Sequence, residues 1–534
     1  MFDAIVVGSG AAGTFAAYPL RGLNTLMLDV GLAHTPARRL NRNLYDLLKT
    51  GGDLSRELLG DEFESLANID GSYLSPKLKS PLMRFVTRDW ARLSPVEATG
   101  FEPIMSFAMG GLANGWGAGV YRCTPDELRG FPISVADLEP FYDELTAHMG
   151  ISGTDDDLTS TFGSAAHLLP PVQLSRLSES LLESYRLRRQ LFANAGIIMG
   201  RPRLAVLTRD HGKRLRHDYA NLEFFKPRIP SIYNPAFTLE EMIAGRKVSY
   251  LSGRLVLHYR EHEAHVEITA RNLHTGEMER FLGRKVLLAA GAINTAKIVL
   301  QSRADCETRL PLLDNAISYV PLLNWKLIGC PLERTALSIA QLNLVYRGPL
   351  EPDPVQATYY GITGPLRSDV LWDFPFALQG NLAAARYVMP AVGIMQLFYP
   401  DRPEGHNFIS LTPEGRLQIR YQPKRLGRLE RHLIRVFRRI GQWSAPSLCR
   451  YPAPGNSYHY AGCLPMQTSP GPCQTDSCGL LWGTRRVHVV DSANFTVLPA
   501  KNLTFTVMAN AMRIAQRVRE ELAGSRATIC GEAT

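Results

Sequence analysis

The sequence predicts a mixed fold, α/β and α+β, in which a parallel-sheet domain is assembled from distant segments and a second domain is inserted between them. Three observations support this prediction. A glycine-rich turn follows an apolar run within the first 13 residues, and a second apolar run at 285–291 also ends in glycine. Near the C-terminus, a short apolar run at 487–491 precedes a periodic helix. Between these segments, residues 304–454 are richer in Pro, Tyr and Phe, which favours an α+β domain containing a sheet.

The composition is that of an ordinary globular protein. The 534 residues are 45% hydrophobic and 20% charged, which is enough to bury a large core in more than one domain. No apolar stretch approaches the length that crosses a bilayer, and a strand starting at Phe2 leaves no room for a signal peptide. We therefore expect a cytoplasmic protein without a transmembrane segment. Eight unevenly spread cysteines indicate reduced thiols rather than a disulfide framework.

The first element is a strand that runs into a GxGxxG turn. Residues 4–7 are apolar and rich in β-branched side chains, as a short buried strand is, and Gly8, Gly10 and Gly13 follow. In such a turn the first glycine bends the chain, the second lets a pyrophosphate approach the backbone, and the third lets the helix pack on the strand.

A helix and a second strand complete this unit. Residues 11–20 form the expected helix, whose N-terminus would face phosphate charge. Residues 25–28 form a strand that ends in Asp29, where a carboxylate can accept hydrogen bonds from a ribose. The complete unit predicts a dinucleotide site, and a chance glycine-rich turn is the alternative.

The middle of the chain supplies five further segments. Residues 105–119 are dense in glycine, which indicates that the backbone there approaches something flat or bulky. Ser134 is expected to cap the start of a helix. Residues 247–284 alternate apolar and polar in short runs, which predicts an antiparallel meander. The buried strand at 285–291 then leads into a helix at 294–300.

A basic amphipathic helix is predicted at 424–440. The chain has a net charge of +9, and its arginines are densest here, while apolar residues recur at helical spacing. Such a face is most often solvated, and contact with a membrane surface or an acidic carrier is the alternative. The chain contains neither zinc-finger spacing nor an RNA-binding aromatic motif, so no nucleic-acid partner is expected.

The last elements are the strand at 487–491 and a helix at 503–521, for which Asn502 is a candidate N-cap. Three cysteines between 463 and 478 precede them. Their spacings of ten and five residues match no standard zinc pattern, so no metal site is expected.

Four separate segments resemble the glucose-methanol-choline (GMC) family of FAD-dependent oxidoreductases. They are the turn Gly8-Ser-Gly-Ala-Ala-Gly13, the loop at 110–119, residues 291–302, and the C-terminal residues 458–466, 490–491 and 502–506. The C-terminal spacing is close to that of the family, since Asp491 follows His459 by 32 residues and Asn502 follows Asp491 by 11.

The chain also departs from the family pattern. Ala296 and Arg303 stand where Pro and Gly are usual, and Leu503 replaces the Pro that commonly follows the second catalytic residue. In members that bind flavin covalently, the linking His would fall near Gly115. This sequence has no His there, so we expect FAD to bind without a covalent link.

The resemblance implies a Rossmann-like FAD-binding domain built from discontinuous segments. These segments are 1–130, which includes the flavin loop, 246–303 and 455–523. Residues 131–245 would form a substrate-side cap region, residues 304–454 a substrate-binding domain with an antiparallel sheet, and residues 524–534 a tail.

The resemblance also implies the site residues. His459 would be the catalytic base, and Asn502 would hydrogen-bond the substrate oxygen, although Asn502 as a plain helix cap and His459 as a structural histidine are the alternatives. Trp116 would line the flavin face or belong to the core. The expected cofactor-binding residues are Gly8, Ser9, Gly10, Ala11, Ala12, Gly13, Asp29, Gly110, Gly111, Asn114, Trp116, Gly117, Leu255, Gly291, Asp491, Ser492, Leu503 and Thr504.

The implied activity is oxidation of a C–OH group on a polar, sugar- or polyol-like metabolite, with hydride passing to flavin N5 and the proton to His459. The electron acceptor would be oxygen, a quinone or a protein carrier. Three alternatives stay open: a desaturase or light-driven fatty-acid decarboxylase with a long apolar tunnel, a nicotinamide dehydrogenase, and a non-catalytic flavin-binding protein.

Overall fold

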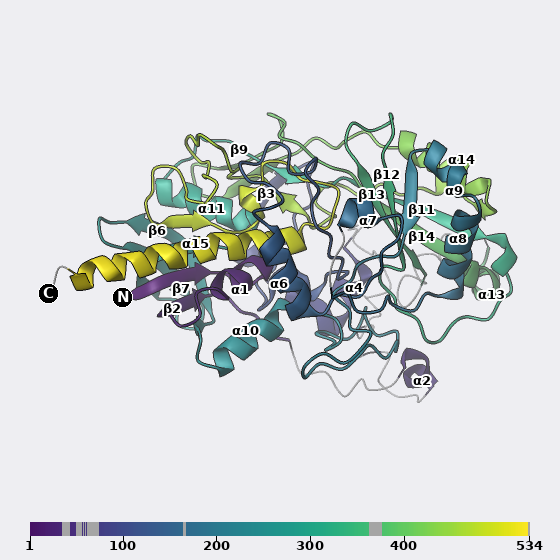
Figure 1. Cartoon of the computed structure of the whole chain (residues 1–534), viewed down its shortest axis with the longest axis horizontal. Helices are drawn as coiled ribbons and strands as arrows, with labels where there is room; N and C mark the ends of the chain where they lie inside the picture. Colours follow the sequence, from purple (N-terminus) through teal and green to yellow (C-terminus); the bar gives the residue numbers. More distant parts are fainter. Residues whose placement is uncertain are drawn as a thin grey trace.

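Two large sheets stand at opposite ends of the molecule (Figure 1). The computed structural model describes residues 1–34, 43–49, 56, 58, 60, 74–163, 167–362 and 376–531. Within this part of the chain, no helix combines the length and the apolar composition that crossing a bilayer requires.

The first sheet has seven strands and joins the two ends of the chain. Its order is β5-β2-β1-β8-β7-β6, and β19 also pairs with β8. The strands β5, β2, β1, β8 and β19 are parallel, whereas β6, β7 and β8 form an antiparallel meander. The bounds are β1 Phe2–Val7, β2 Thr25–Leu28, β5 Ser249–Leu251, β6 Arg254–Glu261, β7 Val266–Asn272, β8 Met278–Leu288 and β19 Val487–Val489.

The sequence predicts two elements in this region, the end of a meander and a separate buried strand. The structure has a single strand there, β8. It is one strand of eleven residues. Its first half pairs with β7 and its second half with β1 and β19, from Gly283 onward. The change in pattern near 285 therefore marks a change of neighbours and not a break in the strand.

Helices cover both faces of this sheet. Ala4 and Val6 of β1 pack toward α1 (Ala11–Ala17), α10 (Pro235–Ala244) and α15 (Thr504–Gly531). Ile5 and Val7 pack toward α11 (Ala292–Arg303) on the opposite face. This alternation is what a β-strand between two helical layers requires. The long helix α15 lies along α1, so the C-terminal segment covers the N-terminal unit (Figure 1).

The helix expected after Ser134 begins later. Ser134 donates hydrogen bonds to the Asp137 carboxylate from both its backbone N–H and its hydroxyl, and these close a local turn. The helix α6 (Glu139–Met149) starts after that turn, with Pro140 in its first turn. Proline fits there because it lacks the N–H that a helix start leaves unpaired.

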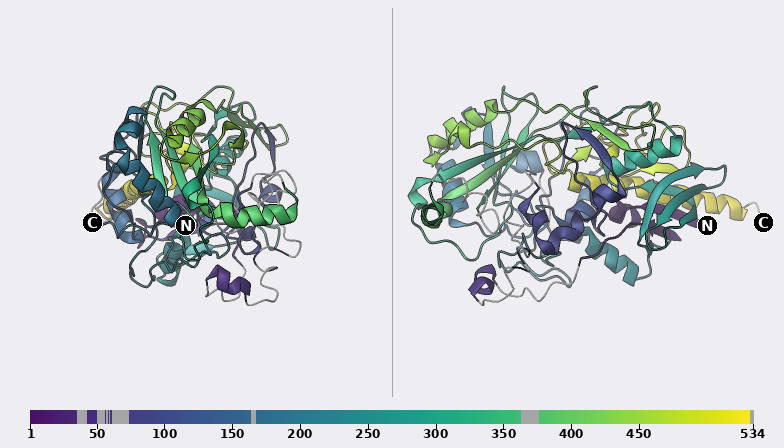
Figure 2. Two further views of the ribbon diagram at one scale, coloured as in Figure 1. Left: turned by 90° about the vertical axis from the view of Figure 1, so that its right-hand side faces the viewer. Right: turned by 180° about the vertical axis from the view of Figure 1, so that it is seen from behind.

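The second sheet has six antiparallel strands in the order β17-β11-β14-β13-β12-β4. One face packs, through residues such as Leu322 and Leu397, on α8 (Arg176–Leu187), α9 (Arg189–Asn194) and α14 (Arg428–Arg438). The strand bounds are β4 Ile197–Gly200, β11 Ile317–Asn324, β12 Leu342–Tyr346, β13 Val355–Gly361, β14 Val392–Phe398 and β17 Gln442–Trp443. Figure 2 shows this sheet end-on and from behind.

The predicted basic helix at 424–440 is α14, and its apolar stripe is part of this packing. Leu429, Leu433 and Phe437 are buried against the sheet, and its arginines point outward.

Two small sheets and several short helices connect the large units. The strand order β3-β16-β15-β9 forms one small sheet, and β10 pairs with β18 in the other. The bounds are β3 Val96–Thr99, β9 Leu310–Pro311, β10 Leu313–Asp314, β15 Phe408–Leu411, β16 Leu417–Arg420, β18 Tyr460–Ala461, α2 Leu44–Lys49, α4 Pro76–Lys79, η2 Pro81–Val86, α5 Trp90–Leu93, η3 Gly111–Asn114, α7 Thr159–Phe162, η4 Trp325–Leu327, α13 Leu378–Val388, η5 Met389–Ala391, η6 Pro446–Leu448 and η7 Ser492–Asn494.

Candidate active site

A cavity of about 1160 Å³ lies between the two large sheets. On one side its wall is formed by the carboxyl ends of parallel strands, where the turn after β1, Gly291 after β8 and Asp491 after β19 meet. On the other side its wall is one face of the six-stranded sheet. Ligands of α/β proteins bind at such carboxyl ends of strands.

The glycine turn has the close packing that its sequence predicts. A Cβ atom on Gly13 would lie 1.9 Å from the carbonyl oxygen of Gly8, so helix and strand approach to a distance that only glycine permits. Gly8 itself has a φ of 97°, in the left-handed region. Gly10 begins α1, and among the described residues no side chain caps this helix start. Its free N–H groups face the cavity and could bind an anion.

Asp29 lies at the end of β2 and lines the same cavity. Its carboxylate accepts hydrogen bonds from the hydroxyls of Ser9 and of Tyr250, the latter at 2.9 Å. Burial raises the pKa of Asp29 to about 6, although both hydrogen bonds act in the opposite direction. The carboxylate is thus held in one orientation at the cavity wall.

Asp491 ties three segments together behind the cavity. Its carboxylate accepts hydrogen bonds from the Gly291 N–H at 2.9 Å, the Thr295 hydroxyl at 2.5 Å and the Ala493 N–H at 2.9 Å. Burial raises the pKa of Asp491 to about 6. This arrangement fixes the start of α11 against the segment that follows β19.

His459 is placed by the short β10-β18 ladder. Asp314, the last residue of β10, pairs with Tyr460 in that ladder, so the residues next to this pair, Asn315 and His459, lie close together. The Oδ1 atom of Asn315 lies 2.9 Å from Nδ1 of His459. The Asn315 amide nitrogen donates to two backbone carbonyls, those of Tyr399 at 2.7 Å and Pro499 at 3.1 Å, which fixes which amide atom faces the imidazole.

This contact determines the tautomer of His459. Because the facing atom is a carbonyl oxygen, Nδ1 must carry the proton and donate it. The other ring nitrogen, Nε2, therefore keeps its lone pair, and the residue lines the cavity. The ring of Phe398 stacks on the imidazole with centroids 5.2 Å apart. Burial lowers the pKa of His459 to about 4, so the imidazole is neutral at pH 7.

The loop that carries His459 is anchored on a buried acid. Asp314 accepts hydrogen bonds from the hydroxyl of Ser457 and from the N–H of Gly455, at 2.8 Å for the latter. The Ser457 hydroxyl oxygen in turn accepts the His459 N–H at 3.0 Å. Burial raises the pKa of Asp314 to about 7.

Asn502 lies just before α15 and lines the cavity. A Cβ atom on Gly119 would lie 3.2 Å from the Asn502 side-chain oxygen and 2.9 Å from the ring of Tyr121. The glycine therefore leaves space between these two side chains. Trp116, in the same loop, donates its indole N–H to the Tyr233 carbonyl at 2.9 Å and also lines the cavity.

Most of the predicted site residues lie together. Of the twenty, those that line the cavity are Gly8, Ser9, Gly10, Ala11, Ala12, Asp29, Gly111, Trp116, Gly117, Leu255, Gly291, His459, Asp491, Ser492, Asn502, Leu503 and Thr504. The other three are Gly13, Gly110 and Asn114. Gly13 packs on Gly8, and Asn114 bonds with the loop backbone and with Arg228 and Asn234, so they hold the turn and loop in shape.

Sequence reasoning missed Asn315 and Phe398, which touch the His459 ring. Neither belongs to a motif, and Asn315 lies 144 residues from His459. Across the described ranges, no three His, Cys, Asp or Glu side chains are arranged to hold a metal ion.

Comparisons with known proteins found one family model and solved structures that match the chain. Residues 447–511, which include His459, Asp491 and Asn502, match the family model described as GMC oxidoreductase. The solved structure of pyridoxine 4-oxidase from Mesorbium loti aligns with a TM-score of 0.60 over 97% of this chain and 99% of that chain, at 15% identity. No curated protein matches the chain in sequence. The predicted resemblance to GMC oxidoreductases is confirmed, and the aligned structure shows the same overall fold.

Proposed function

We propose that this chain, as a GMC-type oxidoreductase, binds FAD without a covalent link and oxidises a C–OH group with His459 as the base. One observation carries the proposal. The cavity that the dinucleotide turn opens into is also lined by a neutral imidazole whose Nε2 lone pair is available. A C–OH oxidation needs a proton acceptor next to a hydride acceptor.

The cavity fits a dinucleotide flavin. The turn and the uncapped start of α1 suit a pyrophosphate, and Asp29 suits a ribose. Gly111 approaches Gly10 so closely that a Cβ atom on it would lie 3.1 Å from the Gly10 Cα, which supports a narrow slot there. Leu503 and Thr504 bring the positive end of α15 to the cavity. When bound, FAD would supply the hydride acceptor.

Side chains of the protein would accept the hydroxyl proton of the substrate and orient the reacting groups. Nε2 of His459 would accept the hydroxyl proton of the substrate, because Nδ1 is already protonated and bonded to Asn315. The stacked Phe398 ring and the Asn315 amide hold the imidazole in one plane. Asn502, which lines the same cavity, would hydrogen-bond the substrate oxygen and so position the reacting carbon.

The lining of the cavity supports a different substrate from the predicted sugar or polyol. The wall that the six-stranded sheet contributes is mainly apolar, with a few polar groups between the apolar side chains. A sugar would leave hydroxyls unpaired against such a wall. We therefore propose an alcohol with an aromatic or aliphatic body. The apolar residues of these strands are Pro321, Leu323, Val392, Ile394, Phe398 and Trp443, and the polar ones are Tyr319, Thr358, Tyr360 and Gln396.

A spectroscopic screen tests the function. The purified protein is expected to be yellow, and anaerobic addition of benzylic or aliphatic alcohols, pyridoxine included, is expected to bleach it faster than glucose or sorbitol. No bleaching by any alcohol would refute the oxidation. A colourless protein that binds NAD would refute the flavin, and light-dependent release of CO₂ from a fatty acid would favour the decarboxylase.

The pH dependence tests the role of His459. Flavin reduction requires the neutral imidazole, so its rate should rise with pH through about 4 and stay level above about pH 5. In Asn315→Asp, a carboxylate beside Nδ1–H would favour the protonated ring and raise the pKa of His459. The rise should then move to higher pH by about one unit or more, as measured by stopped-flow absorbance.

Two further variants separate this effect from a structural one. Asn315→Leu removes the acceptor without adding charge, so it should slow reduction about tenfold at every pH without moving the rise. Asn407→Asp changes another buried asparagine that does not line the cavity, and should leave the profile unchanged. An unshifted profile in Asn315→Asp would contradict the proposed tautomer control.

A further inference from the structure

Large apolar side chains are exposed at the end of the molecule that carries the six-stranded sheet. They come from the turn after β11, from α13, and from β17 with η6. We call this set the mouth surface. Its apolar members are Trp325, Ile328, Leu378, Leu382, Tyr387, Trp443 and Leu448, of which Trp325 is 60% and Trp443 48% exposed.

These three segments are neighbours in the structure. Leu323 pairs with Trp443 across β11 and β17, and Trp325 lies beside Gly441, with its indole nitrogen 3.3 Å from where a Cβ atom would stand. The Gly329 N–H donates to the Tyr387 carbonyl at 2.8 Å, which joins α13 to the same turn. In the left view of Figure 2, where this end faces the viewer, α13 (green) lies at the front.

The mouth surface is also the place where the cavity wall reaches solvent. Trp443 and Leu448 line the cavity and are exposed as well, and Val388 at the end of α13 lines it too. Apolar side chains of the cavity wall therefore continue onto the outer surface, with the basic side chain of Arg450 beside them.

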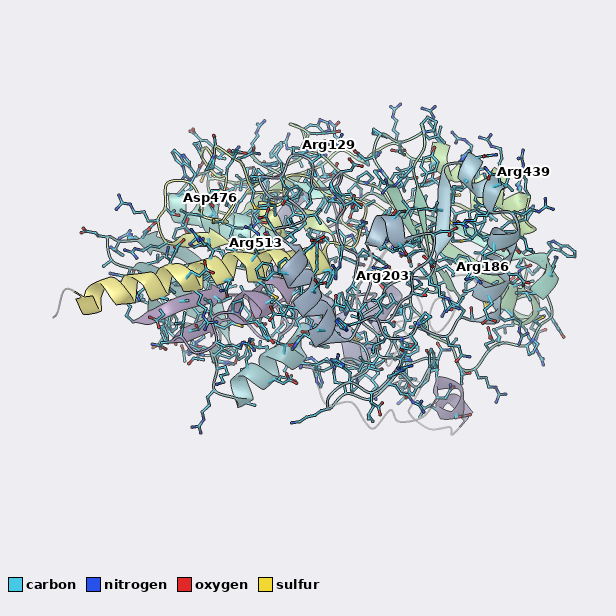
Figure 3. The ribbon with its side chains drawn as sticks, viewed as in Figure 1. Arg129, Arg186, Arg203, Arg439, Asp476 and Arg513 are labelled. Atoms are coloured by element: carbon cyan, nitrogen blue, oxygen red, sulfur yellow. The ribbon has the colours of Figure 1, made fainter. Side chains whose placement is uncertain are left out.

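The charged side chains of the three described segments that form this surface are basic. In residues 325–329, 376–391 and 441–450 there are three basic side chains and no Asp or Glu. The adjacent helix α14 adds exposed arginines, and its one acid, Glu430, is fully buried. Arg438 joins α14 to the mouth surface through hydrogen bonds to the Ser444 carbonyl, at 2.6 Å for the shorter one. Figure 3 labels Arg439 at this end.

We propose that the mouth surface docks on an anionic lipid bilayer and takes the alcohol substrate from it. The docking is argued from the residues of the mouth surface, and the uptake of the alcohol rests on the proposed function. Aromatic side chains favour the membrane interface, and basic side chains are attracted to anionic headgroups. On α13, Leu378, Leu382 and Arg386 follow each other at intervals of four residues, which puts them along one side of a helix that can lie in the interface.

Vesicle sedimentation of the flavin-loaded protein tests the docking. The protein should bind vesicles of phosphatidylcholine with about 30% phosphatidylserine, and more weakly at high salt or with phosphatidylcholine alone. Trp325→Ser and Leu382→Ser should each weaken binding about tenfold, because each removes a large apolar contact with the interface. Trp482→Ser, which changes a tryptophan 42% exposed beside the seven-stranded sheet, should bind as the unmodified protein does.

Charge reversal tests the electrostatic part separately. The double variant Lys326→Glu, Arg386→Glu should lose at least about tenfold in affinity for the anionic vesicles, with little change for neutral ones. The double variant Arg280→Glu, Arg517→Glu, which reverses two exposed arginines on β8 and α15, is the matched control. Equal binding by all variants, or none by the unmodified protein, would overturn the proposal. So would a dimer that Trp325→Ser converts to a monomer, because a second copy would then cover the surface.

The last comparison separates docking from function. A long-chain alcohol carried in vesicles should bleach the flavin more slowly in Trp325→Ser, whereas a water-soluble alcohol should bleach both proteins at the same rate. If soluble alcohols react but vesicles do not bind, the docking is wrong and the oxidation stands. If vesicles bind as described and no alcohol reacts, the oxidation is wrong and the docking stands.

Discussion

His459→Ala is expected to slow reduction of the flavin by a substrate alcohol at least 100-fold, roughly the contribution of a general base, while FAD stays bound. The substitution removes Nε2, which is the base that the contact with Asn315 leaves unprotonated on this ring. Stopped-flow measurement of anaerobic bleaching gives the rate. The visible spectrum of the variant shows whether it still holds flavin.

A second histidine serves as the control for this experiment. Burial lowers the pKa of His148 to about 4 as well, and its Nε2 lies 2.7 Å from the Thr238 hydroxyl, but it does not line the cavity. His148→Ala should therefore lower the free energy of unfolding. It should leave the rate of flavin reduction within about threefold of that of the unmodified protein. Unchanged reduction in His459→Ala would remove this residue from the chemistry.

Gly13→Val is expected to give a protein without bound flavin. Even a single Cβ atom at this position would lie 1.9 Å from the Gly8 carbonyl oxygen and 2.8 Å from its carbon, so α1 must move away from β1. That movement opens the turn in which Gly10 and the first N–H groups of α1 face the cavity. We expect the free energy of unfolding to fall by about 3 kcal/mol or more.

The ratio of flavin to protein absorbance and thermal unfolding measure these two effects. Gly405→Val is the matched control, because no atom lies within 4 Å of its Cβ position and its backbone φ is not positive. It should keep its flavin and its stability. A Gly13→Val protein that retains a full complement of flavin would show that the turn does not hold the cofactor.

Local patterns predicted the parts of this fold that depend on neighbours in sequence. The alternation in 247–284 became the β6-β7-β8 meander, and the glycine spacing at 8–13 became a turn that a Cβ atom would break. Element ends were less predictable, because they depend on packing. The helix predicted at 294–300 runs over Ala292–Arg303, and the last helix extends to Gly531 instead of 521.

The environment of the imidazole could not be predicted in this way. His459 was found from its spacing to Asp491 and Asn502, yet the residues that contact its ring, Asn315 just after β10 and Phe398 at the end of β14, are distant in sequence. Their placement follows from a two-residue ladder and from sheet packing, for which no sequence pattern is visible. The apolar wall of the cavity was missed for the same reason, since each strand shows only its own alternation.

The topology of the seven-stranded sheet also determines when, during synthesis, the nucleotide end of the cavity can fold. Its strand β1 is synthesised before β8, which pairs with it, and before β19, which pairs with β8, and both of these follow hundreds of residues later. The nucleotide end of the cavity is therefore unfinished through most of translation, and the imidazole and α15 emerge last. Cofactor capture must follow synthesis of nearly the whole polypeptide, because a nascent chain stalled before residue 487 would lack β19 and α15 and hence part of the cavity wall.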